Sequence, residues 1–129
     1  TDAHTGFADG YPLLVTNEAS LDALNVRLPA AIPMARFRPN LVVRSDDAWA
    51  EDTWRQLDID GVRFDGVKPC ARCAIINVDQ TSGEKPDGDA PLKTLGEVHA
   101  IEGRGAIFGM NLVHRGTGVV RVGAQVTIG

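Results

Sequence analysis

The chain has 129 residues, of which 43% are hydrophobic and 23% charged, and this length suits a single domain with one core. Its net charge of −4 without a basic stripe excludes a general nucleic-acid binder, because such proteins cluster Lys and Arg against phosphate. No apolar run approaches the ~20 residues of a spanning helix and no signal peptide is visible, so a cytoplasmic location without membrane contact is expected.

The first predicted elements are a strand and the best helix in the chain. Thr1–Gly10 is small and polar and predicts a loop, whereas the apolar run Pro12–Val15 predicts a strand. Thr16 or Asn17 can cap the helix that follows with a side-chain oxygen. Leucines then recur at helical spacing and predict one buried helix face: Leu21, Leu24 and Leu28.

Short strands joined by turns are predicted for the middle of the chain. Asn40–Arg44 is rich in β-branched residues, and Asp60-Gly61 is a strong hairpin signal. Gly66 interrupts the alternation of the following strand, as a β-bulge does. The apolar stretch Cys73–Val78 predicts another buried strand.

The last third predicts a short helix and three closing strands. Thr81–Ala90 is a loop rich in Gly, Pro and Asp, and Pro91–Val98 predicts a helix with proline in its first turn. The closing strands are Gly105–His114, Val119–Val122 and Ala124–Ile128. Seven or eight short strands with one good helix and one or two weak ones favour a mainly β fold, a barrel or a sandwich.

Cys70 and Cys73 are the only cysteines, in C-x-x-C spacing. Lys68 and Arg72 flank the thiols, and nearby cations favour the reactive thiolate. The pair fits a redox dithiol, half of a zinc site, or a single thiolate ligand to a redox metal with the second thiol in support. A dithiol usually opens a helix, and zinc requires two further ligands. The alternative without a chemical role is that both cysteines are small, buried hydrophobic side chains.

Two arginines alternate around Phe37. Pro39 disfavours a helical Arg38, so an extended segment is expected to place Arg36 and Arg38 on one face, with Asn40 two residues further along. Arginine grips phosphate and planar oxyanions with two parallel hydrogen bonds. The segment therefore predicts either an anion site or a solvated edge strand that pairs with nearby carboxylates.

Several segments, taken in order, resemble the MOSC domain, the C-terminal domain of molybdenum cofactor sulfurases. The similarity is closer to the branch that contains the mitochondrial amidoxime-reducing component and its bacterial relatives. RFRPNLVV and KPCARC are the most specific segments. The others are GYPLLVTNEASLDALNVRL, AEDTW, VDQTSG, PLKTL, FGMN and GVVRVGAQV.

This resemblance implies a MOSC-type β-barrel, closed or partly open, that binds molybdenum cofactor. It implies a metal ligand at Cys73, donors near the metal at Ala71 and Arg72, contacts to the pterin phosphate and edge at Arg38 and Asn40, and a further cofactor contact at Asp9. The implied activity is two-electron reduction of an N-hydroxylated small molecule, with electrons from a separate redox protein.

Relatives carry an additional N-terminal barrel domain, so residues 1–129 are expected to form one MOSC domain without it. Two alternatives follow. The chain is a non-catalytic sulfur or cofactor carrier that uses Cys70 and Cys73, or it is a truncated, inactive domain.

Overall fold

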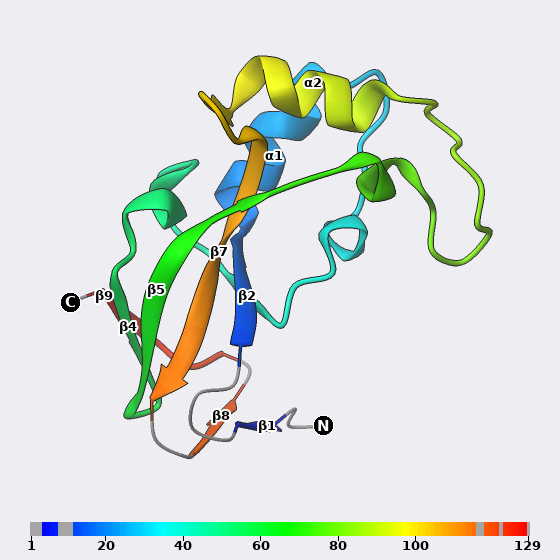
Figure 1. Cartoon of the computed structure of the whole chain (residues 1–129). Helices are drawn as coiled ribbons and strands as arrows, with labels where there is room; N and C mark the ends of the chain where they lie inside the picture. Colours follow the sequence, from blue (N-terminus) through cyan, green and yellow to red (C-terminus); the bar gives the residue numbers. More distant parts are fainter. Residues whose placement is uncertain (1–3, 8–11, 116–117, 122, 129) are drawn as a thin grey trace.

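More residues lie in strands than in helices in the computed structural model, which describes residues 4–7, 12–115, 118–121 and 123–128 (Figure 1). The strands are β1 (His4–Phe7), β2 (Pro12–Asn17), β3 (Leu41–Val43), β4 (Gln56–Ile59), β5 (Val62–Ala71), β6 (Ala100–Ile101), β7 (Gly105–Arg115), β8 (Gly118–Arg121) and β9 (Val126–Ile128). The helices are α1 (Glu18–Arg27), α2 (Ala90–Val98) and the short 3-10 helices η1 (Met34–Phe37), η2 (Ala50–Thr53) and η3 (Ala74–Asn77).

The main sheet has the strand order β3-β2-β7-β5-β4-β9, with β6 beside β7, whereas β1 pairs with β8 in a separate ribbon. β2 and β3 are parallel, and the other pairs are antiparallel. The sheet curls until it is nearly closed into a barrel, with one seam between β3 and β9. Both α-helices lie at one end of it (Figure 1). The predicted mainly β fold with a closed or partly open barrel is confirmed.

Buried side chains form two clusters. The barrel cluster lies between the strands and contains Leu13, Val15, Val43, Trp54, Leu57, Ile59, Val62, Phe64, Met110 and Leu112. The helix cluster lies beneath α1 and α2 and contains Leu24, Leu28, Ile32, Phe37, Ile76, Leu95 and Phe108. Phe37 belongs to η1 and Ile76 to η3. The helix cluster therefore anchors η1 and also η3, which directly follows the cysteine pair in the chain.

Local signals in the sequence are confirmed at several positions. Asn17 caps α1, because its Oδ1 accepts a hydrogen bond of 3.0 Å from the amide of Ala19. Asp60 and Gly61 both have positive φ, at 53° and 77°, as a two-residue hairpin turn of type I′ requires. The β5–β7 register shifts just after Gly66, which is the predicted bulge.

Two predicted elements are wrong. Residues 4–7 are not loop but strand β1, which pairs with β8 from the other end of the chain. Cys73–Val78 is not a strand, because η3 occupies its centre. A short apolar run buries equally well as a strand or as a helical turn. Here the amide of Leu92 at the start of α2 donates to Asn77 Oδ1 at 2.9 Å, a tertiary contact that favours the turn.

A buried carboxylate ties η2 to the start of α1. Glu51 is fully buried, and Ser20 Oγ lies 2.8 and 2.7 Å from its two carboxylate oxygens. Asn17 Nδ2 donates to it at 3.2 Å, and the Trp49 amide donates to Ser20 Oγ at 2.7 Å. Burial raises the pKa of Glu51, while the hydrogen bonds from Ser20 and Asn17 act in the opposite direction.

This carboxyl makes folding stability depend on pH. Because the pKa of Glu51 is higher in the folded state, the folded protein holds the proton more tightly than the unfolded chain does. The contribution of Glu51 to folding stability is therefore fully present below the unfolded pKa of about 4.3 and is lost as pH rises through the folded pKa.

We expect Glu51→Gln to remove this dependence of stability on pH. In urea denaturation, the stability of the wild type relative to the variant should fall as pH rises above about 4. Glu97→Gln, at an exposed position, is the control, and a difference that does not vary with pH would contradict the prediction.

Candidate functional site

The cysteine pair lies where β5 runs into η3. Cys70 is half-buried at the end of β5, and Cys73 is exposed and has extended backbone angles of −131° and −175°. The Arg72 amide between them donates to the carbonyl of Ala106 at 2.9 Å and prolongs the pairing with β7. Both cysteines are free thiols in this structure, without a disulfide between them.

Arg72 joins this cysteine element to the segment that carries Arg38. Its Nη1 donates to Cys70 Sγ at 3.3 Å, and its Nη2 donates to the carbonyl of Phe37 at 2.7 Å. The guanidinium also lies 5.4 Å from the centre of the Phe37 ring, within the range of a cation–π contact. Arg72 thus holds Phe37, the neighbour of Arg38, close to Cys70.

The expectation that Arg36 and Arg38 share one face is wrong. Residues 34–37 form η1 rather than an extended segment. Arg36 is buried, where it donates to the carbonyl of Ile76 at 3.3 Å and lies 4.0 Å from Asp87. Arg38 is exposed and left-handed, with φ 53° and ψ 51°.

Tertiary contacts explain this conformation of Arg38. Proline disfavours the right-handed helical region for the preceding residue, and the Arg38 amide closes η1 by donating to the carbonyl of Ala35 at 3.1 Å. Gln80 Nε2 donates to the same carbonyl at 2.6 Å. A left-handed non-glycine residue costs about 1–2 kcal/mol, and contacts such as these offset that cost. Arg38 alone of the two arginines presents its side chain to solvent.

Asn40 is positioned by the first residues of β2. Its amide donates to the carbonyl of Leu14 at 2.9 Å, and its Oδ1 accepts from the amide of Leu14 at 2.8 Å. Among the described residues, its Nδ2 has no hydrogen-bond partner and is free to donate to a ligand. Asp9, the remaining predicted contact, lies outside the described residues.

A cavity of about 330 Å³ adjoins the cysteine element and is lined by Lys68, Pro69, Cys70, Ala71, Arg104 and Asn111. It lies where the register between β5 and β7 shifts, around the pair Lys68 and Asn111. Arg104 reaches it from the turn before β7 and donates to the carbonyl of Pro69 at 3.3 Å. Sequence reasoning did not identify Arg104 or Asn111 as site residues, because only the β5–β7 pairing brings them beside Cys70.

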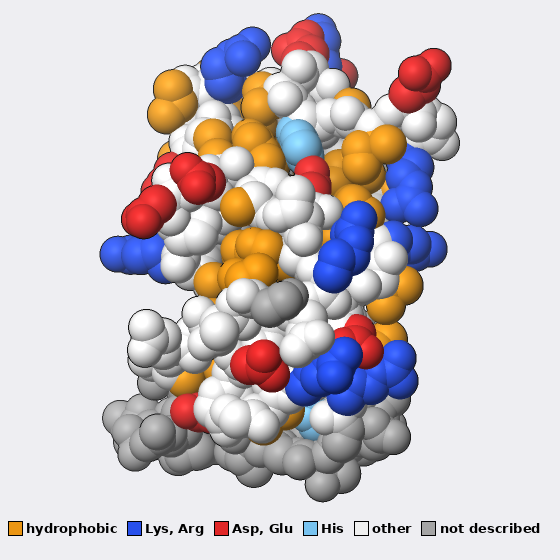
Figure 2. Space-filling view, turned by 90° about the vertical axis from the view of Figure 1, so that its left-hand side faces the viewer, with side chains coloured by type: hydrophobic (Ala, Val, Ile, Leu, Met, Phe, Trp, Pro, Cys, Tyr) orange, Lys and Arg blue, Asp and Glu red, His pale blue; other side chains and the backbone are white. Residues whose placement is uncertain are grey.

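Two further observations bear on the site. Within the described ranges, no group of three or more His, Cys, Asp and Glu is arranged to hold a metal ion, and no helix is long and apolar enough to cross a membrane. On the face shown in Figure 2, Lys and Arg are interspersed with Asp and Glu instead of forming a continuous basic stripe.

A sequence model of the MOSC domain matches residues 2–127. The chain belongs to the MOSC domain family. The MOSC chain is 35% identical to mitochondrial amidoxime-reducing component 1 of Mus musculus, over 98% of this chain and 39% of that relative. It is 43% identical to mitochondrial amidoxime reducing component 2 of Homo sapiens, over 69% of this chain and 26% of the relative. The MOSC chain therefore spans about two fifths, or less, of the length of these relatives.

Proposed function

We propose that this MOSC domain binds a molybdenum cofactor and contributes to the reduction of N-hydroxylated small molecules. The observation that carries the proposal is the double contact of Arg72, with Cys70 Sγ and with the carbonyl of Phe37. This contact links the segment of the exposed Cys73 thiol to the segment of the exposed Arg38 guanidinium. Two comparisons also support the proposal: the chain belongs to the MOSC domain family, and its relatives are named as amidoxime-reducing components.

The donor set fits the chemistry of such a cofactor. A thiolate is a soft ligand suited to a redox metal, a guanidinium suits a phosphate group, and a free amide nitrogen suits a heterocycle edge. In the proposal these are Cys73, Arg38 and Asn40. Arg72 positions the two segments through its contacts with Phe37 and Cys70. Ala71 lines the cavity that adjoins Cys70.

The bound cofactor would supply the two-electron redox chemistry, while the chain binds it and orients it. The chain spans only part of the length of its relatives. We therefore also propose, and do not conclude, that it acts on a small-molecule substrate with electrons from a separate protein. The cytoplasmic location stays a prediction, and the names of the relatives place those proteins in mitochondria.

Binding of molybdenum tests the proposal. The purified chain is incubated with molybdenum cofactor, desalted, and its metal content measured by mass spectrometry. We expect the wild type to retain molybdenum, and Cys73→Ser and Arg38→Ala to lower retention by about tenfold or more. Cys70→Ser is the matched control, because it removes the other thiol of the same motif while the serine oxygen can still accept the hydrogen bond from Arg72, and it should retain molybdenum.

Two outcomes would count against the proposal. Equal retention by Cys73→Ser and wild type would remove Cys73 as the ligand. A persulfide on Cys73 after incubation with a cysteine desulfurase, without molybdenum retention by any variant, would favour the sulfur-carrier alternative.

A further inference from the structure

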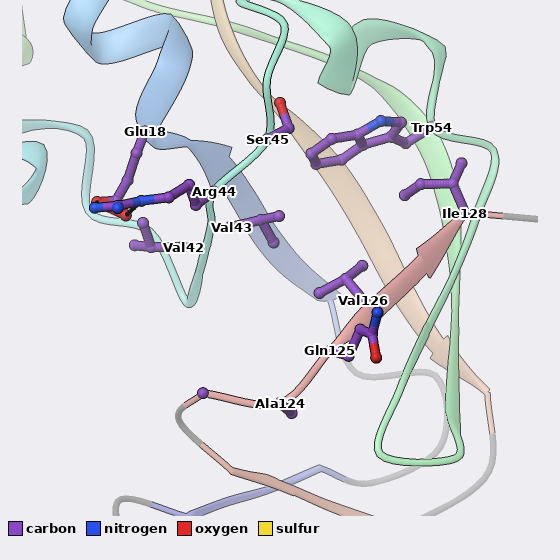
Figure 3. Close-up of a pocket in the computed structure, with 11 residues that line it drawn as sticks. Glu18, Val42, Val43, Arg44, Ser45, Trp54, Ala124, Gln125, Val126 and Ile128 are labelled. Carbon is purple, nitrogen blue, oxygen red and sulfur yellow. Dashed lines mark hydrogen bonds and ion pairs between the residues drawn. The ribbon is translucent and has the colours of Figure 1, made fainter.

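A second and larger cavity occupies the seam of the barrel, away from the cysteine element. It measures about 570 Å³ and lies between the two edge strands β3 and β9 (Figure 3). Among the described residues, β3 pairs only with β2 and β9 pairs only with β4. Each strand therefore presents an outer edge of backbone N–H and C=O groups to the cavity, which is the surface that templates the addition of a strand.

Apolar side chains from both edges line the seam. Val43 and Trp54 form its floor and belong to the barrel cluster. Val42 on β3 and Ile128 on β9 are 49% and 48% exposed, and Figure 3 shows them on opposite sides of the cavity. Covering these side chains would remove apolar surface from water, at about 25 cal/mol per Å².

The directions of β3 and β9 limit how an added strand can run. β3 is parallel to β2, and four successive antiparallel pairings lead from β2 through β7, β5 and β4 to β9. After an even number of reversals, β9 runs in the same direction as β3. One inserted strand can therefore pair in the same sense with both edges, and it can run antiparallel to both at once.

The rim of the seam carries no unpaired charge among its described residues. Arg44 donates from Nε and Nη2 to the two carboxylate oxygens of Glu18, at 3.3 and 3.4 Å. The hydrogen bond to Glu18 raises the pKa of Arg44, so the rim is a neutral pair. Such a rim offers no net charge that would attract a charged partner, so charge complementarity favours an uncharged one.

We propose that the seam binds an extended, uncharged polypeptide strand by β-strand addition, antiparallel to β3 and β9. We place the occupant in the polypeptide that the amidoxime-reducing relatives carry outside the region this chain matches, which is more than half of their length. Main-chain hydrogen bonds to both edges supply affinity, and alternate apolar side chains contact Val42 and Ile128.

Peptides that tile the unmatched part of the Mus musculus relative are the probe. Binding of each peptide to the full chain is measured by fluorescence anisotropy. We expect at least one uncharged peptide to bind, and Val42→Asp and Ile128→Asp each to weaken its binding by about tenfold or more. Val26→Asp is the matched control, because Val26 is 83% exposed on α1. Circular dichroism verifies that each variant is folded.

A second measurement does not depend on any variant. Methylation of alternate backbone nitrogens removes N–H donors and leaves the side chains in place, so it should abolish binding of the peptide. The proposal fails if no tiled peptide binds or if Val42→Asp binds the peptide as well as wild type does. It fails as well if the methylated peptide still binds, because main-chain hydrogen bonds to the strand edges would then not supply the affinity. It also fails if sedimentation shows a dimer that Val42→Asp dissociates, because a second copy then covers the seam.

Discussion

Gly66→Ala should prevent this domain from folding stably. An added Cβ at residue 66 would lie 1.9 Å from the carbonyl oxygen of Trp54 and 3.0 Å from its carbonyl carbon. Both are backbone atoms, so no side-chain rotation relieves the overlap. The Gly66 amide also donates to the carbonyl of Arg55 at 2.9 Å, which holds the two segments together. We expect a loss of at least about 4 kcal/mol, a large part of the roughly 5–15 kcal/mol that stabilises a typical domain.

Urea denaturation followed by circular dichroism measures the effect, and Gly96→Ala is the control. Gly96 is exposed in α2, and an added Cβ would meet only Ala106 Cβ at an ordinary 3.9 Å. Alanine is better than glycine within a helix by about 0.8–1.0 kcal/mol, so the control should stabilise the protein. Similar stabilities for Gly66→Ala and wild type would show that the close approach of β5 to Trp54 is wrong.

The second large effect is expected for Phe37→Ala. The Phe37 ring is fully buried and stacks on Phe108 with a centroid distance of 3.8 Å and an interplanar angle of 14°. Trp49 contacts Phe108 in turn, edge to face, at 5.8 Å. Truncation of a buried phenylalanine costs about 3–5 kcal/mol through lost transfer energy and the cavity that remains.

The substitution should also affect the candidate site, because the Arg72 guanidinium lies over this ring. Phe37→Leu restores much of the volume and should recover most of the stability, but it removes the cation–π contact. Val26→Ala, at an exposed helical position, should change stability by less than about 0.5 kcal/mol. A measured loss below about 1.5 kcal/mol for Phe37→Ala would contradict the packing described here.

Local chemistry made several elements predictable. Asn17 caps α1 whatever packs around it, because its side chain meets an amide only two residues away. The Asp60-Gly61 turn follows from the ability of these residues to adopt positive φ. The β-bulge at Gly66 was visible because a glycine interrupts an otherwise alternating strand.

Long-range contacts decided where prediction failed. The apolar stretch 73–78 became η3 because α2 and Arg36 contact Asn77 and Ile76 from distant parts of the chain. The prediction that Arg36 and Arg38 lie on one face failed for a similar reason. Arg36 is drawn into the interior by the carbonyl of Ile76, 40 residues away, and no periodicity within residues 36–40 encodes that contact.

The candidate site divides in the same way. RFRPN and KPCARC, together with the other matching segments, predicted the MOSC family, which is confirmed. The cofactor and the residues proposed to hold it stay predictions. The bridge from Arg72 to Phe37 spans 35 residues of sequence, and the cavity at Asn111 depends on the register of β5 with β7.

The sequence by itself determined a mainly β fold and was enough to propose which residue types carry its chemistry, because turns, caps and motifs act over a few residues. Only the tertiary structure decided which side chains meet, that Arg38 alone of the two arginines faces solvent, and that the barrel is left with a seam. The seam arises from the pairing of strands distant in sequence, and no local propensity shows which edges remain free.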